Sequence, residues 1–228
     1  AHLERISPEV IRELNEVLAK ELTWTGQQQN QTVGGVEAVA EIVNQLDKTP
    51  ETVCLYLACL RAGVVYVPLN TAYQPAEIEY YLADAEPAAV VCRPQAMPLM
   101  AGLAGARRVR HTLTLAAGGA GSFPDGTAGL DGEHAEPATR AEDLAALLYT
   151  SGTTGRPKGA MMTHGLLAAK ATTLAAHWGW RAGDVLLHAM PIFHTHGLFL
   201  SMHCALASGA SLLFLAKSLE RVGDHAKN

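Results

Sequence analysis

The spacing of apolar residues divides the chain into a helical N-terminal part and a longer part in which strands and helices alternate. Residues 7–23 and 36–46 place apolar side chains three and four positions apart, which predicts two amphipathic helices. A polar, glycine-bearing linker or loop over 25–35 separates them. A threonine cap, a proline and an acidic residue then start a third helix, which we expect over 49–61.

From residue 64 onward, short runs of β-branched, aromatic and other apolar residues alternate with helical patterns. The predicted strands cover residues 64–70, 88–93, 109–115, 144–150, 159–164, 184–190 and 210–216. The predicted helices among them cover residues 75–85, 167–178 and 197–209. Strands separated by helices indicate an α/β fold with a mostly parallel sheet. Residues 116–140 are rich in Gly, Ala and Pro and predict a mobile loop.

Composition limits the classes of protein to which the chain can belong. Its 228 residues are 49% hydrophobic and carry a formal charge of −5, which predicts a sizeable core and argues against a nucleic-acid partner. The four cysteines form no C-x-x-C pair, and the first ten residues lack a signal pattern. We therefore expect a protein of the reducing cytoplasm, without a disulfide framework.

One uncharged apolar stretch is long enough to cross a membrane. The segment "GLFLSMHCALASGASLLFLA", residues 197–216, has 20 residues and no Asp, Glu, Lys or Arg. The segment is interrupted by glycines at 197 and 209, by several serines and by His203. It is preceded by Pro191 and by three further histidines. A buried strand, helix and strand in a soluble core explain this pattern better, so we expect no membrane span.

The segment with the clearest chemistry is "LLYTSGTTGRPKGAMMTHG", which follows a predicted strand. Glycine lets a backbone approach phosphate closely, hydroxyl groups add donors, and lysine adds a compact positive charge. The predicted phosphate-binding residues are Thr150, Ser151, Gly152, Thr153, Thr154, Gly155 and Lys158. The spacing is not that of a Walker loop, because Pro157 precedes the lysine and Gly159 follows it.

This segment resembles the signature loop of the adenylate-forming superfamily, which includes acyl-CoA synthetases, luciferases and peptide-synthetase adenylation domains. Residues 54–92 and 183–215 are similar to the segments before and after that loop, and "PIFHTHGL" is most similar to the malonyl-CoA synthetase branch. The resemblance covers about residues 50–217. It implies part of the N-terminal domain of the adenylate-forming fold, with a mostly parallel sheet and flanking helices.

The resemblance also implies a two-step reaction. A carboxylate, here malonate or a similar short dicarboxylate, attacks the α-phosphate of ATP with help from Mg²⁺, and coenzyme A then displaces AMP. Lys158 and His194 are the implied catalytic residues: the loop over 150–158 holds the β- and γ-phosphates, and Lys158 offsets their charge. His194 is implied to lie between the nucleotide and acyl pockets, and His196 to line the acyl pocket.

The histidines leave two alternatives open. Without the resemblance, His194 would be interpreted as a buried, hydrogen-bonded side chain. A zinc site formed by His188, His194, His196 and His203 matches no known ligand spacing, so we expect no metal held by protein residues alone.

The two ends of the chain resemble other families. Residues 4–48 resemble the helical middle region of the flagellar motor switch protein FliG, which implies a contact with motor proteins, and residues 217–228 resemble a helix of PhoU-type regulators. The expected division is therefore a helical segment over 1–49, an incomplete AMP-binding domain over 50–217 and a helical tail over 218–228. The alternative to a ligase fragment is a mosaic chain without catalytic activity.

The resemblance implies elements that the sequence does not show after residue 217. These are a Tyr-Gly-x-Thr-Glu type segment for adenine and magnesium, an aspartate for the ribose, and a small domain with a second catalytic lysine. We therefore expect this chain to be inactive by itself.

Overall fold

The computed structural model describes residues 42–46, 48–130, 137–150 and 156–214. These ranges belong to the second of two units, Ala38–Asn228. The helices predicted over 7–23 and 218–228, most of the one predicted over 36–46, and the segments that resemble FliG and PhoU-type proteins lie largely or wholly outside the described residues.

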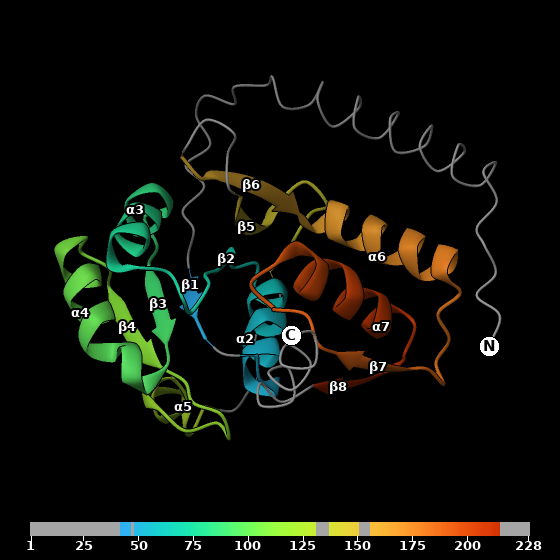
Figure 1. The fold of residues 1–228 in the computed structure, drawn as a ribbon, viewed down its shortest axis with the longest axis horizontal. Coiled ribbons are helices and arrows are strands. Elements are labelled where there is room, and N and C mark those ends of the chain that lie inside the picture. Colours follow the sequence, from blue (N-terminus) through green and yellow to red (C-terminus); the bar gives the residue numbers. More distant parts are fainter. Residues whose placement is uncertain (1–41, 47, 131–136, 151–155, 215–228) are drawn as a thin grey trace, which may run out of the picture. The chain divides into compact units, whose positions relative to one another are not determined.

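A six-stranded sheet, in the order β4-β3-β1-β2-β5-β6, forms the centre of this part of the chain (Figure 1). Its strands are β1 Ile42–Gln45, β2 Tyr66–Pro68, β3 Ala89–Cys92, β4 His111–Thr114, β5 Leu144–Thr150 and β6 Lys158–Thr163. The first five are parallel, and β6 runs antiparallel to β5. This agrees with the predicted α/β class and mostly parallel sheet.

Side chains that alternate along the strands face two separate cores. Val43, Val67 and Val90 are level with one another across β1, β2 and β3 and pack under the helices α3 Pro75–Ala85 and α4 Met97–Ala106. On the other face, Tyr66 and Val91 pack with α2 Pro50–Arg61. Burial of both faces is the usual condition for a parallel sheet, and it explains the continuous apolar strand sequences.

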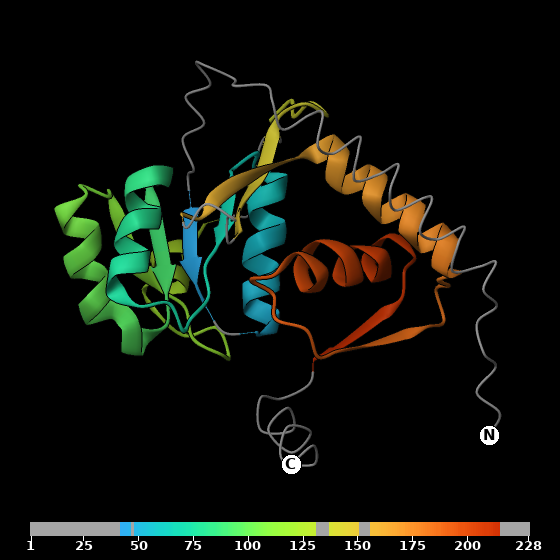
Figure 2. The same cartoon turned by 45° about the horizontal axis from the view of Figure 1, so that its top comes forward.

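Within the same compact unit, a smaller unit formed around a sheet of two parallel strands follows the main sheet along the chain. After β6, helix α6 His164–Trp178 leads to β7 Val185–His188, which pairs with β8 Ser211–Phe214. Between these strands lies a helical segment that has π-helical bonding over His196–Met202 and α-helical bonding over His203–Ala207, the element α7. Figures 1 and 2 both show α6 running alongside α7, and the two helices are in contact.

Tyr56 of α2 joins the smaller unit to the main sheet. Its hydroxyl forms a 2.8 Å hydrogen bond with Nε2 of His203, and its ring lies 4.9 Å from that of Tyr66 and 6.0 Å from that of Phe199. Tyr56 is fully buried. Burial also lowers the pKa of His203 to about 4, because a charged imidazole is poorly solvated there.

The helix starts at α2 and α3 follow the local signals in the sequence. Thr49 caps α2 by accepting a hydrogen bond from the Thr52 amide, and Gln74 and Glu77 form a capping box at α3. The remaining short helices are a 3-10 turn over Pro94–Ala96 and α5 Ser122–Thr127. Neither α4 nor α5 was predicted, and α5 lies inside the segment that was expected to be a loop.

The helix predicted over 36–46 is wrong where the structure describes it. Residues 42–45 form β1, which lies in the middle of the sheet between β2 and β3. A short apolar run such as Ile42-Val43 fits helical and strand patterns alike, and pairing on both sides with distant strands decides the outcome. The sheet therefore starts before residue 50, where the sequence had placed the beginning of the α/β part.

Within the described residues, no helix is both long enough and apolar enough to cross a membrane. The stretch over 197–214 divides instead into the π-helical and α-helical segment and strand β8. The four cysteines, all within the described ranges, are free.

We predict that the free energy of unfolding decreases as the pH is lowered from about 6.5 to about 4, the ordinary and the folded pKa values of His203. In this interval the unfolded chain binds a proton on His203 while the folded chain does not, so acid favours unfolding. The effect is up to about 3 kcal/mol. Urea unfolding at several pH values measures it. In His203→Gln the free energy of unfolding should depend less on pH over this interval. An unchanged pH dependence in that variant would contradict the assignment to His203.

Candidate active site

The hairpin of β5 and β6 presents the first and last predicted phosphate-binding residues opposite each other. Thr150 ends β5, Lys158 begins β6, and the two are paired in the antiparallel register. Both side chains are exposed, whereas Tyr149, immediately before Thr150, is buried. The other predicted residues of the loop, Ser151, Gly152, Thr153, Thr154 and Gly155, lie outside the described residues.

The position of Thr150 is typical of a ligand site in an α/β protein. It lies at the carboxyl end of β5, which runs parallel to β2, β1, β3 and β4. Ligands of open α/β sheets bind outside this edge, because the strand ends and the loops that follow them converge there. A hydroxyl and an ammonium group facing solvent at this edge are suitable donors for an anionic ligand.

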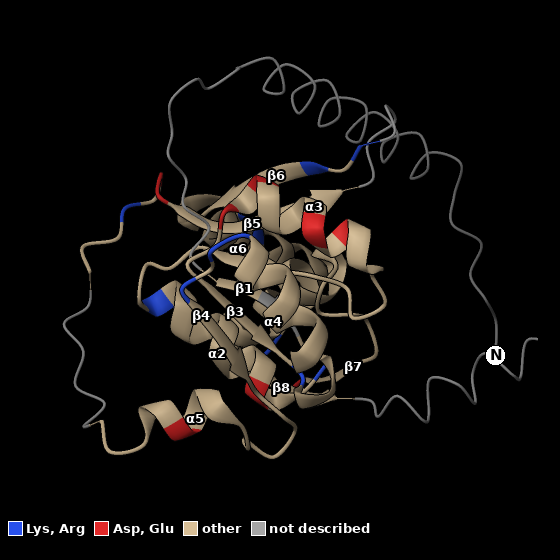
Figure 3. Ribbon diagram, turned by 90° about the vertical axis from the view of Figure 1, so that its left-hand side faces the viewer, with Lys and Arg blue, Asp and Glu red and all other residues tan. Residues whose placement is uncertain are grey.

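Two hydrogen bonds connect the hairpin to α3. The Tyr80 hydroxyl donates to the carbonyl oxygen of Pro157 at 2.9 Å, and the Tyr149 hydroxyl donates to Oδ2 of Asp84 at 2.6 Å. Burial, and then the neighbouring Asp84 carboxylate, raise the pKa of Tyr149, so its hydroxyl remains a proton donor. The ribbon colours of Figure 3 mark acidic positions on α3 and basic positions at the start of β6.

His194 and His196 lie together where the chain enters the π-helical segment. Their rings stack with centroids 5.9 Å apart and an interplanar angle of 21°, and both side chains are exposed. The interpretation of His194 as a buried histidine is therefore wrong. Both side chains are accessible to a ligand, and π-helical turns occur often at functional sites. Within the described residues, no group of three or more His, Cys, Asp or Glu is arranged to hold a metal ion.

His188 is buried beside this pair, and the sequence had named it only as one member of a zinc site that matches no known ligand spacing. It ends β7, is 1% exposed, and its Nε2 lies 2.9 Å from the carbonyl oxygen of Gly197. This hydrogen bond connects the strand to the start of the π-helical segment, whose first residue is His196. Gly197 has no space for a side chain, because a Cβ there would overlap the carbonyl oxygen of Pro191. In the sequence, only the glycine directly after His196 indicated that the backbone is tightly packed at this position.

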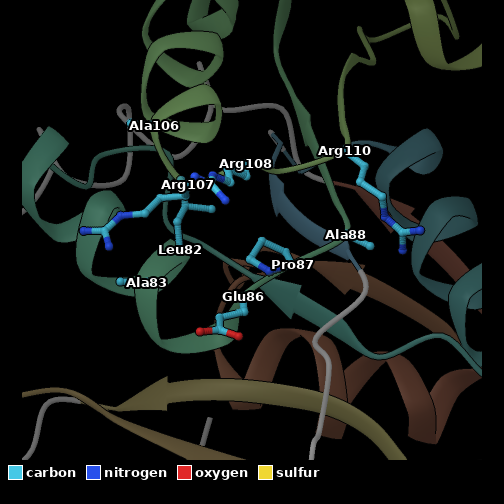
Figure 4. Close-up of a pocket in the computed structure, with 9 residues that line it drawn as sticks. All are labelled: Leu82, Ala83, Glu86, Pro87, Ala88, Ala106, Arg107, Arg108 and Arg110. Carbon is cyan, nitrogen blue, oxygen red and sulfur yellow. The ribbon is translucent and has the colours of Figure 1, made fainter.

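A cavity of about 510 Å³ lies away from this hairpin. Its lining residues are Leu82, Ala83, Glu86, Pro87, Ala88, Ala106, Arg107, Arg108 and Arg110. They precede β3 and β4, at the edge of the sheet opposite Thr150. In Figure 4 the Arg107 and Arg110 side chains point away from each other, and Arg107 pairs with Glu79 at 3.1 Å. The guanidinium groups do not converge on a ligand.

Another cavity, of about 290 Å³, lies at the same edge of the sheet as Thr150. Its lining residues are Leu46, Thr49, Thr52, Arg93, Pro94, Gln95, Leu115, Ala116 and Ala117. They follow β1, β3 and β4. The carboxyl edge is therefore hollowed at the ends of β4, β3 and β1, and β2 lies between these strands and the hairpin.

Comparison with known protein families gives one match that spans most of the chain. Residues 33–226 match the family of AMP-binding enzymes. The chain belongs to this family. The match includes residues 33–48 and 217–226, so it overlaps both ends for which the sequence suggested other relatives. The comparisons do not support the FliG and PhoU resemblances or a mosaic origin.

Solved structures agree with this assignment and with the fold. ATP-bound MatB from Rhodopseudomonas palustris is 45% identical with a TM-score of 0.73, over 79% of this chain and 36% of that chain. A malonyl-CoA ligase with methylmalonyl-CoA and AMP bound is 31% identical with a TM-score of 0.62, over 78% and 35% of the two chains. The described residues thus form part of an adenylate-forming domain.

Curated relatives include ligases for short dicarboxylates. The mitochondrial malonate–CoA ligase ACSF3 of Mus musculus is 34% identical over 154 residues, which are 68% of this chain and 26% of the relative. The oxalate–CoA ligase of Arabidopsis thaliana is 32% identical over 168 residues, 72% of this chain and 32% of the relative. The chain spans a quarter to a third of the length of these relatives.

We predict that Gly197→Ala destabilises the fold by about 1–3 kcal/mol, because the new Cβ would meet backbone atoms of Pro191 that cannot move aside cheaply. Gly183→Ala is the matched control, since a Cβ at Gly183 would meet nothing within 4 Å. Urea unfolding of both variants checks the difference. Equal midpoints would show that the turn before the π-helical segment tolerates a side chain.

Proposed function

We propose that the chain is part of an ATP-dependent acyl-CoA ligase that activates malonate or a similar short dicarboxylate as an acyl-adenylate and then forms a thioester with coenzyme A. The observation that carries this proposal is the pairing of Thr150 with Lys158 at the carboxyl edge of the sheet. Family membership and the likeness to ATP-bound MatB support it.

In this proposal the hairpin binds the outer phosphates of ATP. Lys158 offsets the charge of the β- and γ-phosphates, and Thr150 donates a hydroxyl hydrogen bond beside it. Ser151, Gly152, Thr153, Thr154 and Gly155 complete the loop as donors, an assignment that rests on their sequence alone. Lys158 is exposed, so it reaches a ligand from solvent without first losing a buried partner. Its contribution is electrostatic, since developing charge on phosphate oxygen is stabilised by a fixed cation.

His194 and His196 are proposed to face the acyl substrate. They are exposed, stacked and held in place through Gly197 by the buried His188. Imidazole groups can donate hydrogen bonds to a carboxylate. The position of His194 between the nucleotide and acyl pockets remains a proposal that rests on the resemblance of "PIFHTHGL".

Mg²⁺ and coenzyme A are general to the family. Within the described residues no cluster of acidic or histidine side chains is arranged for a metal. A magnesium ion would therefore reach this part of the site with the ATP phosphates, beside the donors of the hairpin. When bound, it would neutralise phosphate charge, and Lys158 would act on the same oxygen atoms from the protein side.

We predict that Lys158→Ala weakens binding of MgATP to the chain roughly 10- to 100-fold, the usual effect of losing a hydrogen bond to a charged group. Isothermal titration calorimetry measures the dissociation constant. Lys170→Ala is the matched control, because Lys170 is an exposed lysine on α6 outside the hairpin. Equal affinities in the two variants would reject the role of Lys158.

We further predict that the 228-residue chain alone catalyses no ATP–pyrophosphate exchange with malonate above a Lys158→Ala control, because it spans only 36% of the MatB chain. Fused to the remainder of that MatB, in place of the equivalent segment, it should support exchange that Lys158→Ala abolishes. Exchange by the chain alone, or an inactive but folded fusion, would contradict the prediction that this chain supplies only part of the active site.

A further inference from the structure

We propose that α3 is the positioning element of the phosphate-binding hairpin, and that Tyr80 and Asp84 hold the ends of its two strands in the geometry that ATP requires. This inference rests on the proposed function of the hairpin. Sequence reasoning assigned α3 no role beyond packing, and neither residue is among the predicted site residues.

Each of the two contacts ends beside one of the two exposed residues of the hairpin. Tyr80 binds the carbonyl group of Pro157, the residue immediately before Lys158. Asp84 binds the hydroxyl group of Tyr149, the residue immediately before Thr150. One hydrogen bond therefore ends next to each residue proposed to bind the ligand: one inside β5, the other on the residue that leads into β6.

One face of a single helix makes both contacts. Tyr80 and Asp84 are four residues apart, so they lie one above the other on α3. Their spacing along the helix is fixed by its geometry, and it sets the relative position of the β5 and β6 ends. No other described hydrogen bond connects α3 to this hairpin.

The helix is itself firmly attached to the sheet. Ile78, Tyr81 and Leu82 are almost fully buried in the core under α3. The ring of Tyr81 lies 4.6 Å from that of Tyr149, and the ring of Tyr80 packs edge-on to Tyr81 at 5.6 Å. Aromatic contacts of this kind restrict movement of α3 relative to β5. The helix can therefore transmit a fixed geometry to the hairpin.

The hairpin also has its own backbone pairing, separate from these two bonds. Strands β5 and β6 are already paired from Leu144 opposite Thr163 to Thr150 opposite Lys158. The two bonds add orientation at the end of the hairpin where β5 stops and β6 begins, and where Thr150 and Lys158 bear the donors. Groups fixed before the ligand arrives lose less conformational entropy on binding, so the affinity for the ligand is higher.

The experiment compares nucleotide affinity, backbone protection and stability in the full chain. Tyr80→Phe removes only the hydroxyl that binds Pro157. Asp84→Ala removes the acceptor of Tyr149, whereas Asp84→Asn retains an amide oxygen and should restore it. Tyr73→Phe is the matched control, because its ring belongs to the same aromatic group, 5.0 Å from Tyr81, but no described hydrogen bond joins it to the hairpin side chains.

We expect Tyr80→Phe and Asp84→Ala each to raise the MgATP dissociation constant roughly 3- to 10-fold. In ligand-free hydrogen exchange, peptides that contain Thr150 and Lys158 should exchange faster in both variants, while peptides from α2 and β3 stay unchanged. Asp84→Asn and Tyr73→Phe should resemble the unmodified chain in both measurements.

The outcomes separate this inference from the proposed function. Unchanged affinity and unchanged exchange in Tyr80→Phe, with normal MgATP binding by the unmodified chain, would overturn the role of α3 and leave the proposed function intact. A lower midpoint of urea unfolding with unchanged affinity would assign Tyr80 to stability alone and also overturn it. MgATP affinity that is insensitive to Lys158→Ala but falls in Tyr80→Phe would refute the proposed lysine role, while the effect of α3 remained visible.

Discussion

The architecture depends on burying both faces of a parallel sheet. Neighbouring residues of one strand serve different cores: Val90 packs under α3 and α4, whereas Val91 packs on the side of α2. Both layers are needed, because exposed apolar strands would be unstable in water. Once the layers are in place, the carboxyl edge of the sheet is the part left for ligands, and the hairpin of β5 and β6 emerges from that edge.

The same two layers carry the two halves of the candidate site. Helix α3, on one face, contacts the hairpin through Tyr80 and Asp84. Helix α2, on the other face, contacts the π-helical segment and α7 through Tyr56, with Phe199 and His203 packed against its ring. The hairpin with the proposed phosphate-binding groups is thus contacted by α3, and the helical segment that begins at His196 is contacted by α2.

The strand ends and helix starts were largely predictable because local chemistry determines them. The strand over 144–150 was predicted with its observed bounds, the cap at Thr49 precedes α2 as expected, and α3 covers the predicted residues 75–85. β1 was not predictable from spacing, since Ile42 and Val43 fit either pattern. α4 also escaped prediction, because its Ala- and Gly-rich sequence has little amphipathic contrast.

The sequence alone determined the chemistry of the candidate site: hydroxyl groups, glycines and one lysine in a spacing that resembles the adenylate-forming loop, and two histidines ahead of a glycine. Only the tertiary structure decided which of these groups face solvent and what holds them. It placed Thr150 opposite Lys158, exposed His194, buried His188 against Gly197, and brought Tyr80 and Asp84 to the hairpin from more than sixty residues away in the chain. Residue identity fixes what a side chain can donate or accept, but its neighbours depend on how distant segments pack.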